Sequence, residues 1–222
     1  TEYVAKADIA YRTAIKHQVE GGFGYVTLHC DYISDKSFDQ DVKIRRVRDP
    51  LMIWLDPDAQ DPTGLDANFG FEFEIKARSA FFRKWKKWKN KLGATTLGAD
   101  QTTIDDDHIL QVMYYRRSGE MDELIGYTEP SSGQEVVVFR SEQEPELIDP
   151  IIEQIRNGDI EGNIRDVMNQ SVDWFLIAGD EIIDRGDSEK TRWPGKYIPI
   201  VRLVGDEEVM DGRIDRKGMT RY

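Results

Sequence analysis

The first stretch of the chain indicates its fold class: residues 2–33, EYVAKADIAYRTAIKHQVEGGFGYVTLHCDYI. Over residues 2–19 the apolar side chains recur every three or four positions, which places them on one stripe of an amphipathic helix. Gly21 and Gly22 are expected to end that helix. Over residues 25–33 apolar and polar side chains alternate, as they do in a half-buried strand. A helix followed directly by a strand predicts an α+β fold.

The residues that follow predict more strands than helices. Residues 42–47 should pair with the first strand through a turn near residues 35–37. The apolar run at residues 51–55 is typical of a buried strand, and turn-forming residues close it at 56–58 and 61–64. The first part of the chain is therefore a mixed region with a helix and a β-hairpin.

The second part is predicted to be rich in β-structure. Residues 109–116, 123–128 and 135–140 favour a β-meander, with turns at Ser118-Gly119 and at residues 130–133. A short helix should follow it. Further strands are expected at residues 172–178, 181–184, 197–204 and 208–210, with turns at Gly179-Asp180 and Asp211-Gly212.

The short helix of the second part has recognisable end signals. Asp149 and Pro150 suit the N-cap and the first helical position, and Gly158 stands where a closing glycine is preferred. Isoleucines between these ends form its apolar stripe. The predicted helix therefore packs one face on the neighbouring strands.

Composition excludes several classes of protein. The 222 residues include 42 acidic and 30 basic side chains, for a formal charge of −12. With one cysteine and three histidines, no disulfide framework or Cys/His metal cage can form, and a reducing compartment is expected. No apolar run approaches the roughly 20 residues that cross a bilayer. The sequence predicts an acidic protein with no membrane partner.

Residues 74–91 have the most unusual local composition. They contain eight Lys or Arg and one Glu, interleaved with Phe and Trp. On a helix, Phe81, Trp85 and Trp88 would share one face. Two interpretations stay open: the lysines neutralise nucleic-acid phosphates while the rings stack on bases, or the rings pack inward as core.

Acidic and histidine residues offer weaker candidates. Asp56, Asp58 and Asp61 lack the spacing of a calcium loop, and Asp105 to Asp107 is typical of a solvated turn. The histidines are expected to be structural, and no nucleotide-binding or nucleophile motif is present. We therefore predict no catalytic residue, no metal and no cofactor. A carboxylate-dependent nuclease that uses Asp56, Asp58 or Asp105 to Asp107 remains a minor alternative.

Two longer sequence segments resemble a known protein family. The first is DPLMIWLDPDA at residues 49–59, continued by GLDA at 64–67 and FGF at 69–71. The second is WPGKYIPIV at 193–201, followed by Gly205, Asp211-Gly212 and GMTRY at 218–222. In order and spacing they are similar to segments of the portal proteins of short-tailed bacteriophages of the Salmonella-phage type. Residues 117–190 resemble that family less clearly.

This resemblance implies a structural protein rather than an enzyme. Portal subunits form a ring, usually of twelve, at one capsid vertex, and double-stranded DNA passes loosely through its channel during packaging and ejection. The implied partners are further copies of the chain, the large terminase subunit of the packaging motor, the tail adaptor protein, and the scaffold and capsid proteins. The implied location is the virion, after assembly in the cytoplasm of the bacterial host.

The resemblance also divides the chain. Residues 1–104 would be a partial wing and stem-proximal region, 105–215 a β-rich, clip-like domain with a short helix, and 216–222 the start of the connection to the second stem helix. The chain is therefore expected to be an internal fragment of a longer portal subunit.

The expected contact residues follow from these roles. Candidates for DNA contact are Arg83, Lys84, Lys86, Lys87, Lys89 and Lys91. Aromatic residues are enriched in the cores of interfaces, so candidates for subunit contact are Tyr114, Tyr115, Phe139, Trp174 and Phe175. Two alternatives stay open: these aromatic residues are intramolecular core, or the chain is a nucleic-acid-binding module that acts through residues 76–91.

Overall fold

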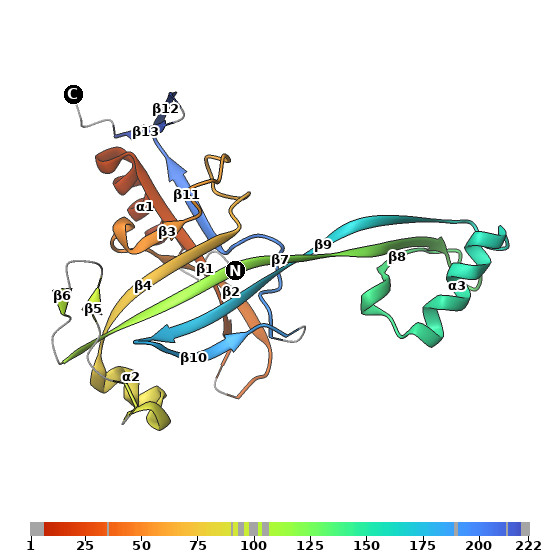
Figure 1. Cartoon of the computed structure of the whole chain (residues 1–222), viewed down its shortest axis with the longest axis horizontal. Helices are drawn as coiled ribbons and strands as arrows, with labels where there is room; N and C mark the ends of the chain where they lie inside the picture. The colour runs from red at the N-terminus through yellow and green to blue at the C-terminus, as the bar shows by residue number, and fades with distance from the viewer. Residues whose placement is uncertain are drawn as a thin grey trace. The chain divides into compact units, whose positions relative to one another are not determined.

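The chain forms two compact units in a computed structural model (Figure 1). Unit 1 comprises residues 1–117 and 172–222, and unit 2 comprises residues 118–171. The structure describes residues 7–34, 36–89, 91–92, 96–97, 102–103, 107–188, 191–211 and 213–218. The expected clip-like region, 105–215, contains all of unit 2 and part of unit 1.

Three α-helices and several antiparallel sheets occur among the described residues, which confirms the predicted α+β class. In chain order the elements are α1 (Ala7–Gly21), β1 (Phe23–Tyr32), β2 (Gln40–Arg46), η1 (Pro50–Met52), β3 (Ile53–Leu55), β4 (Phe69–Ala77), α2 (Arg78–Lys84), η2 (Lys86–Trp88), β5 (Thr96–Leu97), β6 (Thr102–Thr103), β7 (His108–Thr128), β8 (Glu135–Phe139), η3 (Arg140–Glu142), α3 (Pro145–Asn157), β9 (Gly162–Ala178), β10 (Glu181–Gly186), β11 (Ile200–Val204), β12 (Asp206–Met210) and β13 (Arg213–Lys217).

The small sheet of unit 1 has the order β11-β1-β2, and α1 packs on it. The predicted helix and hairpin are confirmed here, although the first six residues lie outside the described residues. Gly22 adopts a φ of +90°, a conformation that favours glycine where the chain leaves α1. A Cβ atom on Gly24 would lie 2.1 Å from the carbonyl oxygen of Ala14. The backbone of α1 therefore lies directly against β1.

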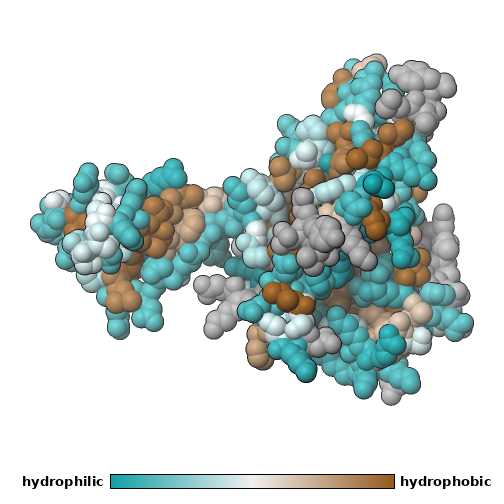
Figure 2. Space-filling view, turned by 180° about the vertical axis from the view of Figure 1, so that it is seen from behind, coloured by the Kyte–Doolittle hydropathy of each residue, from teal (hydrophilic) through white to brown (hydrophobic). Residues whose placement is uncertain are grey.

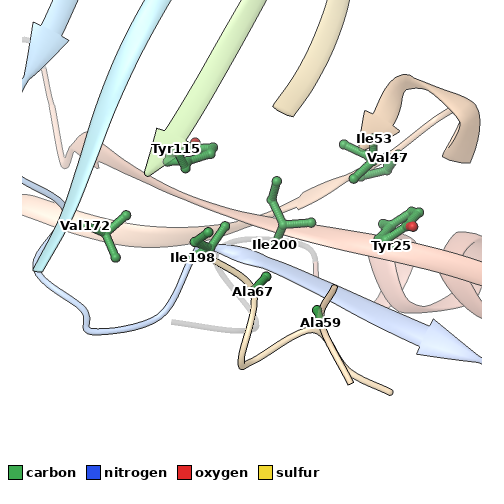
Figure 3. Close-up of a cluster of buried hydrophobic side chains, with 9 residues drawn as sticks. All are labelled: Tyr25, Val47, Ile53, Ala59, Ala67, Tyr115, Val172, Ile198 and Ile200. Carbon is green, nitrogen blue, oxygen red and sulfur yellow. The ribbon is translucent and has the colours of Figure 1, made fainter. Parts of the chain in front are cut away.

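The large sheet of unit 1 has the order β10-β9-β7-β4-β3. Its inner face packs on the small sheet and on the loop between β3 and β4, and the buried side chains come from all three (Figure 3). These side chains are Tyr25, Val47, Ile53, Ala59, Ala67, Tyr115, Val172, Ile198 and Ile200. A second core on the same face of the sheet joins β7, β9 and β10 to α2. The two sheets are thus held together by apolar contacts.

The apolar run at residues 51–55 is only partly a buried strand, which corrects the prediction. Residues 50–52 form a 3-10 turn, and only residues 53–55 pair with β4. Ile53 is buried, whereas Leu51 and Trp54 are 69% and 59% exposed. Trp54 pairs with Phe71 and therefore lies on the face of the sheet opposite to Ile53, and Leu51 belongs to the 3-10 turn.

The predicted turn at Ser118-Gly119 is also wrong. β7 continues through it as one strand of 21 residues. Gly119 instead allows the Met168 side chain to pack closely against the backbone of β7, because a Cβ atom there would lie 3.0 Å from the sulfur of Met168. The later turn at residues 130–133 is confirmed, with Gly133 at a φ of +68° and Glu129 N–H donating to the carbonyl of Gln134 at 2.9 Å.

Unit 2 consists of the second half of β7, the first half of β9, the strand β8 and the helix α3. The helix begins at Pro145, not at the predicted Asp149-Pro150, so Pro150 lies inside it. Its predicted end is confirmed, because Gly158 is left-handed with a φ of +82°. Ile148 and Ile152 of the helix are buried against Ile125 of β7.

Unit 2 is also strongly acidic. It carries 13 acidic and three basic residues, for a formal charge of −10 out of the chain's −12. Hydrophilic residues cover much of unit 2 on the face shown in Figure 2, where apolar residues form a narrower band. Charge of one sign keeps such a small unit well solvated.

Candidate subunit and DNA interfaces

The outer face of the large sheet, away from the small sheet, carries a row of aromatic side chains. On β4, Glu72 points inward, where its Oε2 lies 3.1 Å from Nε2 of His29 on β1. Because side chains alternate along a strand, Phe71 and Phe73 point outward. Tyr114 pairs with Phe71 across the β4–β7 register and shares that outer face. The hydrophobic positions of β4 thus lie outside and its acidic ones inside.

The aromatic side chains of this face form one continuous contact series. We name it the aromatic face and define it as Trp54, Phe71, Phe73, Tyr114 and Phe175. The ring centroids lie 5.0 Å apart for Trp54 and Phe73, 6.1 Å for Phe73 and Phe71, 4.8 Å for Phe71 and Tyr114, and 5.8 Å for Tyr114 and Phe175. Its members come from β3, β4, β7 and β9. The series therefore crosses most of the sheet.

Arg116 lies at one end of the aromatic face, over the ring of Phe175. The Arg116 guanidinium lies 5.7 Å from the centroid of the Phe175 ring. It donates to the carboxylate of Asp173 at 2.9 Å, which Arg192 also reaches at 2.8 Å. Asp173 is 2% exposed. These two charge-assisted bonds satisfy the buried carboxylate and hold Arg116 over the ring.

Two of the five predicted contact residues, Tyr114 and Phe175, belong to this face. Tyr115 is buried in the core of unit 1, where burial raises the pKa of its hydroxyl. Trp174 also points inward, and its Nε1 donates to the carbonyl of Thr191 at 2.8 Å. Phe139 lies in unit 2 and is half-buried. The structure therefore brings Tyr114 and Phe175 together on one face of unit 1 and turns Tyr115 and Trp174 to the other face.

Sequence reasoning missed Trp54, Phe71 and Phe73. The signal was present, because the strand at residues 69–75 carries an apolar side chain at every second position. That period shows that one face of the strand is apolar. It does not show whether this face is covered.

The basic segment, residues 83–91, is not part of one long helix as its composition indicated. Residues 74–77 belong to β4, residues 78–84 form α2, and residues 86–88 form a 3-10 turn. Extended pairing between β4 and β7 reaches Ala77, which prevents an earlier helix start. Phe81 is buried, and Trp85 and Trp88 pack against the same core. The aromatic rings thus point inward, as one of the two open interpretations held.

The cationic side chains of this segment remain on the surface. Those of Arg83, Lys84, Lys86, Lys87, Lys89 and Lys91 are all exposed. Three of the ammonium groups also lie 5.1 to 5.6 Å from the centroids of Trp85 and Trp88, which they help to cover. No acidic residue occurs between residues 83 and 91. The segment presents a local positive charge on an acidic chain.

The acidic cluster after β3 is a hydrogen-bonded loop. Asp56 is 3% exposed, and its carboxylate accepts from the backbone N–H groups of Asp58 and Asn68 at 3.0 and 2.9 Å and from the Asn68 side chain at 3.0 Å. Burial alone would raise the pKa of Asp56, but these hydrogen bonds lower it below its ordinary value. Asp61 accepts from the backbone N–H of Thr63 at 2.7 Å. The carboxylates organise the turn.

The other candidates for chemistry show no activated group where the structure describes them. Asp105 and Asp106 lie outside the described residues. Burial, together with Asp31 and Asp41, raises the pKa of the Cys30 thiol, which disfavours the nucleophilic thiolate. Within the part of the chain that the structure describes, no three His, Cys, Asp or Glu side chains are grouped to hold a metal ion. Among the same residues, none of the helices is long and apolar enough to cross a membrane.

A cavity of about 560 Å³ lies in unit 1 between β1 and the inner face of the large sheet. Its lining includes His29, Glu72, Trp85 and Tyr115. The approach of His29 to Glu72 is close, yet Glu72 Oε2 makes no hydrogen bond in the described part of the chain. The pair therefore acts as an electrostatic contact between the two sheets when His29 is protonated.

A partly exposed aromatic sheet face and an exposed lysine-rich segment are features that occur at contacts with other macromolecules. The family model of the phage P22-like portal proteins matches residues 1–222. The chain therefore belongs to the P22-like portal protein family. No curated protein matches the chain.

Membership of this family indicates the general role of the chain. The chain is a portal protein of a bacteriophage, and the family is structural rather than enzymatic. The family also implies an oligomeric ring and a place at the capsid vertex of the virion.

Proposed function

We propose that this chain is the wing-to-clip part of a portal subunit, which forms a ring of about twelve copies around a DNA channel. In this role it has no catalytic turnover and needs no cofactor or metal. Double-stranded DNA passes through the ring when the genome is packaged and again when it is ejected. The single observation that carries the proposal is the family match over the whole chain.

The parts of the chain take distinct roles in this proposal. Residues 1–104 belong to the wing and the region near the stem, 105–215 form the clip, and 216–222 lead toward the second stem helix. The clip then meets the large terminase subunit and, later, the tail adaptor. Scaffold and capsid proteins contact the ring during assembly, which takes place in the host cytoplasm.

The ring is tested directly on the full-length product of the gene. Negative-stain imaging and sedimentation should show closed rings with a central channel and a mass close to twelve subunits. A compact monomer at every protein concentration and salt concentration tried would refute the assembly role. In that case the basic segment would become the leading functional site.

We propose further that the basic segment contacts the DNA backbone loosely. Its six cationic side chains are exposed and can neutralise phosphates, whereas the rings of Trp85 and Trp88 pack against the core and are unavailable for stacking on bases. A net charge of −12 opposes tight binding at long range. Weak contact of this kind suits a channel through which DNA must move.

Charge reversal in this segment should remove the DNA affinity of the assembled protein. Changing Lys84, Lys86, Lys87 and Lys89 to Glu should weaken binding to a DNA duplex at low salt by at least about tenfold. It should also reduce the slope of log affinity against log salt by up to about 4, because each phosphate contact contributes about 0.9.

A matched control separates this site from the total charge. Reversal of Arg12, Lys16, Lys36 and Lys196, all exposed and outside the segment, changes the net charge equally and should leave most of the affinity. Equal losses in the two variants would show that the segment is not a DNA contact. Fluorescence anisotropy at several salt concentrations gives both quantities.

A further inference from the structure

The aromatic face is only partly covered by the described residues of unit 1, where Phe71, Phe73, Tyr114 and Phe175 are half-buried. Trp54 is 59% exposed, and Ile75 on β4 and Ile182 on β10 are 45% and 48% exposed. Monomeric proteins rarely expose a contiguous apolar patch of this kind, and such patches mark contacts with other molecules. Stacked aromatic rings are also well suited to be interface anchors, because they lose little side-chain entropy on binding.

A second exposed apolar group lies at the tip of the β1–β2 hairpin. We name it the hairpin tip and define it as Tyr32, Ile33 and Phe38. Their side chains are 56%, 62% and 97% exposed. A phenylalanine with almost its whole side chain in water gains the most from burial against a partner.

Two hydrogen bonds hold described residues of the hairpin tip. Ile33 N–H donates to the carbonyl of Asp39 at 3.0 Å, and Asp39 N–H donates to the hydroxyl of Ser37 at 3.0 Å. These bonds close the end of the hairpin around Phe38. Each hydrogen bond that restrains the loop before binding lowers the conformational entropy lost on binding.

The hairpin tip cannot reach the aromatic face of its own chain. β1 packs on the inner face of the large sheet, where His29 meets Glu72 and Tyr25 shares a core with Tyr115. The aromatic face lies on the opposite side, and the large sheet separates the two surfaces. A contact between them has to be made by two copies of the chain.

We propose that the hairpin tip of one portal subunit packs on the aromatic face of the next subunit, with Phe38 as the central anchor. This inference rests on the proposed ring. Ring-forming interfaces need two different patches on each subunit, since a head-to-tail contact closes into a ring only if the patches are distinct. The hairpin tip and the aromatic face are two such patches, on opposite sides of one sheet.

Cross-linking of the full-length protein tests the contact. In a background without native cysteines, including Cys30→Ser, the double variant Phe38→Cys with Phe73→Cys is treated with a short thiol-reactive cross-linker. We expect a ladder of linked subunits that rises to the full ring. Each single variant should give no ladder, because each ring contact then carries one thiol. The pair Phe38→Cys with Ile9→Cys is the matched control, since Ile9 is 45% exposed on α1, outside the aromatic face.

The outcomes separate this inference from the proposed function. Rings of normal appearance without a ladder, or with an equal ladder in the Ile9 control, would overturn the contact and leave the portal role standing. Absence of rings from the wild-type protein would overturn both.

A second variant gives an independent reading. Phe38→Asp changes a side chain that is 97% exposed, so circular dichroism and thermal unfolding of the dissociated subunit should match wild type. We expect the protein concentration needed for ring formation to rise at least about tenfold. Met210→Asp, which introduces the same charge at a side chain that is 69% exposed near the end of the chain, should leave that concentration unchanged. Equal behaviour of the two variants would contradict the proposal.

Discussion

Replacing Gly24 with alanine should destabilise unit 1 by about 3 kcal/mol or more, in the upper part of the range for overpacked cores. The new Cβ atom would lie 2.1 Å from the carbonyl oxygen of Ala14 and 2.8 Å from its carbonyl carbon. Both are backbone atoms, so no side chain can rotate away. The whole helix α1 would have to move off β1, which would open the core of Ala10, Ala14 and Val26.

The neighbouring glycine provides the control for this prediction. A Cβ atom on Gly21 would meet nothing within 4 Å, and alanine is the better helix former. Gly21→Ala should therefore leave the free energy of unfolding within about 1 kcal/mol of wild type. Urea unfolding of both variants measures the difference. A Gly24→Ala midpoint equal to that of Gly21→Ala would show that α1 does not pack so closely on β1.

The second large effect is expected at Asp56. Its removal in Asp56→Ala leaves the backbone N–H groups of Asp58 and Asn68 and the Asn68 amide without their acceptor. Hydrogen bonds to a charged group contribute about 1.5–3 kcal/mol each, and these three share one loop, so we expect a total loss of about 3 kcal/mol. Asp58→Ala changes an exposed carboxylate of the same turn and should cost less than about 0.5 kcal/mol.

The effect of Asp56 should also depend on pH with a defined sign. Its folded-state pKa is lowered, so its contribution is fully present above the unfolded value of about 3.9 and is lost as the pH falls through the folded value. The difference in unfolding free energy between wild type and Asp56→Ala should therefore be larger at pH 6 than at pH 3. A difference that grows toward acid would mean that the carboxylate is not stabilised in the folded protein.

Much of the fold could be predicted because the information is local. The helix α1, the strands β1 and β2 and the glycines at residues 158 and 179 follow from side-chain periods of 3.6 and 2 and from backbone conformations that favour glycine. The family resemblance of residues 49–71 and 193–222 likewise depends only on the order and spacing of their residues.

One error occurred where a contact between residues distant in the sequence determines the structure, and another where a second local signal lies nearby. Ser118-Gly119 has the composition of a turn, but contact with Met168 on β9 makes it the middle of a strand. Asp149-Pro150 has the composition of a helix start, yet the chain is already helical at Pro145. At Ser118-Gly119 tertiary packing overrode the local preference, whereas Pro145 is itself a local helix-start signal that precedes the predicted one.

Only part of the aromatic face could be predicted, because the sequence does not show which face of a strand is covered by another layer. Tyr114 and Phe175 were named as contact residues because aromatic side chains are common in interfaces, whereas Phe71 and Phe73 were not named. Which side of a strand faces solvent depends on where the next layer packs, and the approach of Glu72 to His29 settles that here. A period of two cannot distinguish inside from outside.

The long strands β7 and β9 make unit 2 a separable part of the chain. The chain enters unit 2 along β7 and returns along β9, and the hydroxyl oxygens of Ser118 and Ser171 face each other at 3.0 Å where it leaves and re-enters unit 1. Unit 2 is thus an insertion with its two ends side by side. A two-residue turn that joins residues 117 and 172 would replace it and leave unit 1 with an ordinary hairpin. Because both ends of the insertion meet at this junction, unit 2 can be replaced by another insertion while the sequence of unit 1 stays the same.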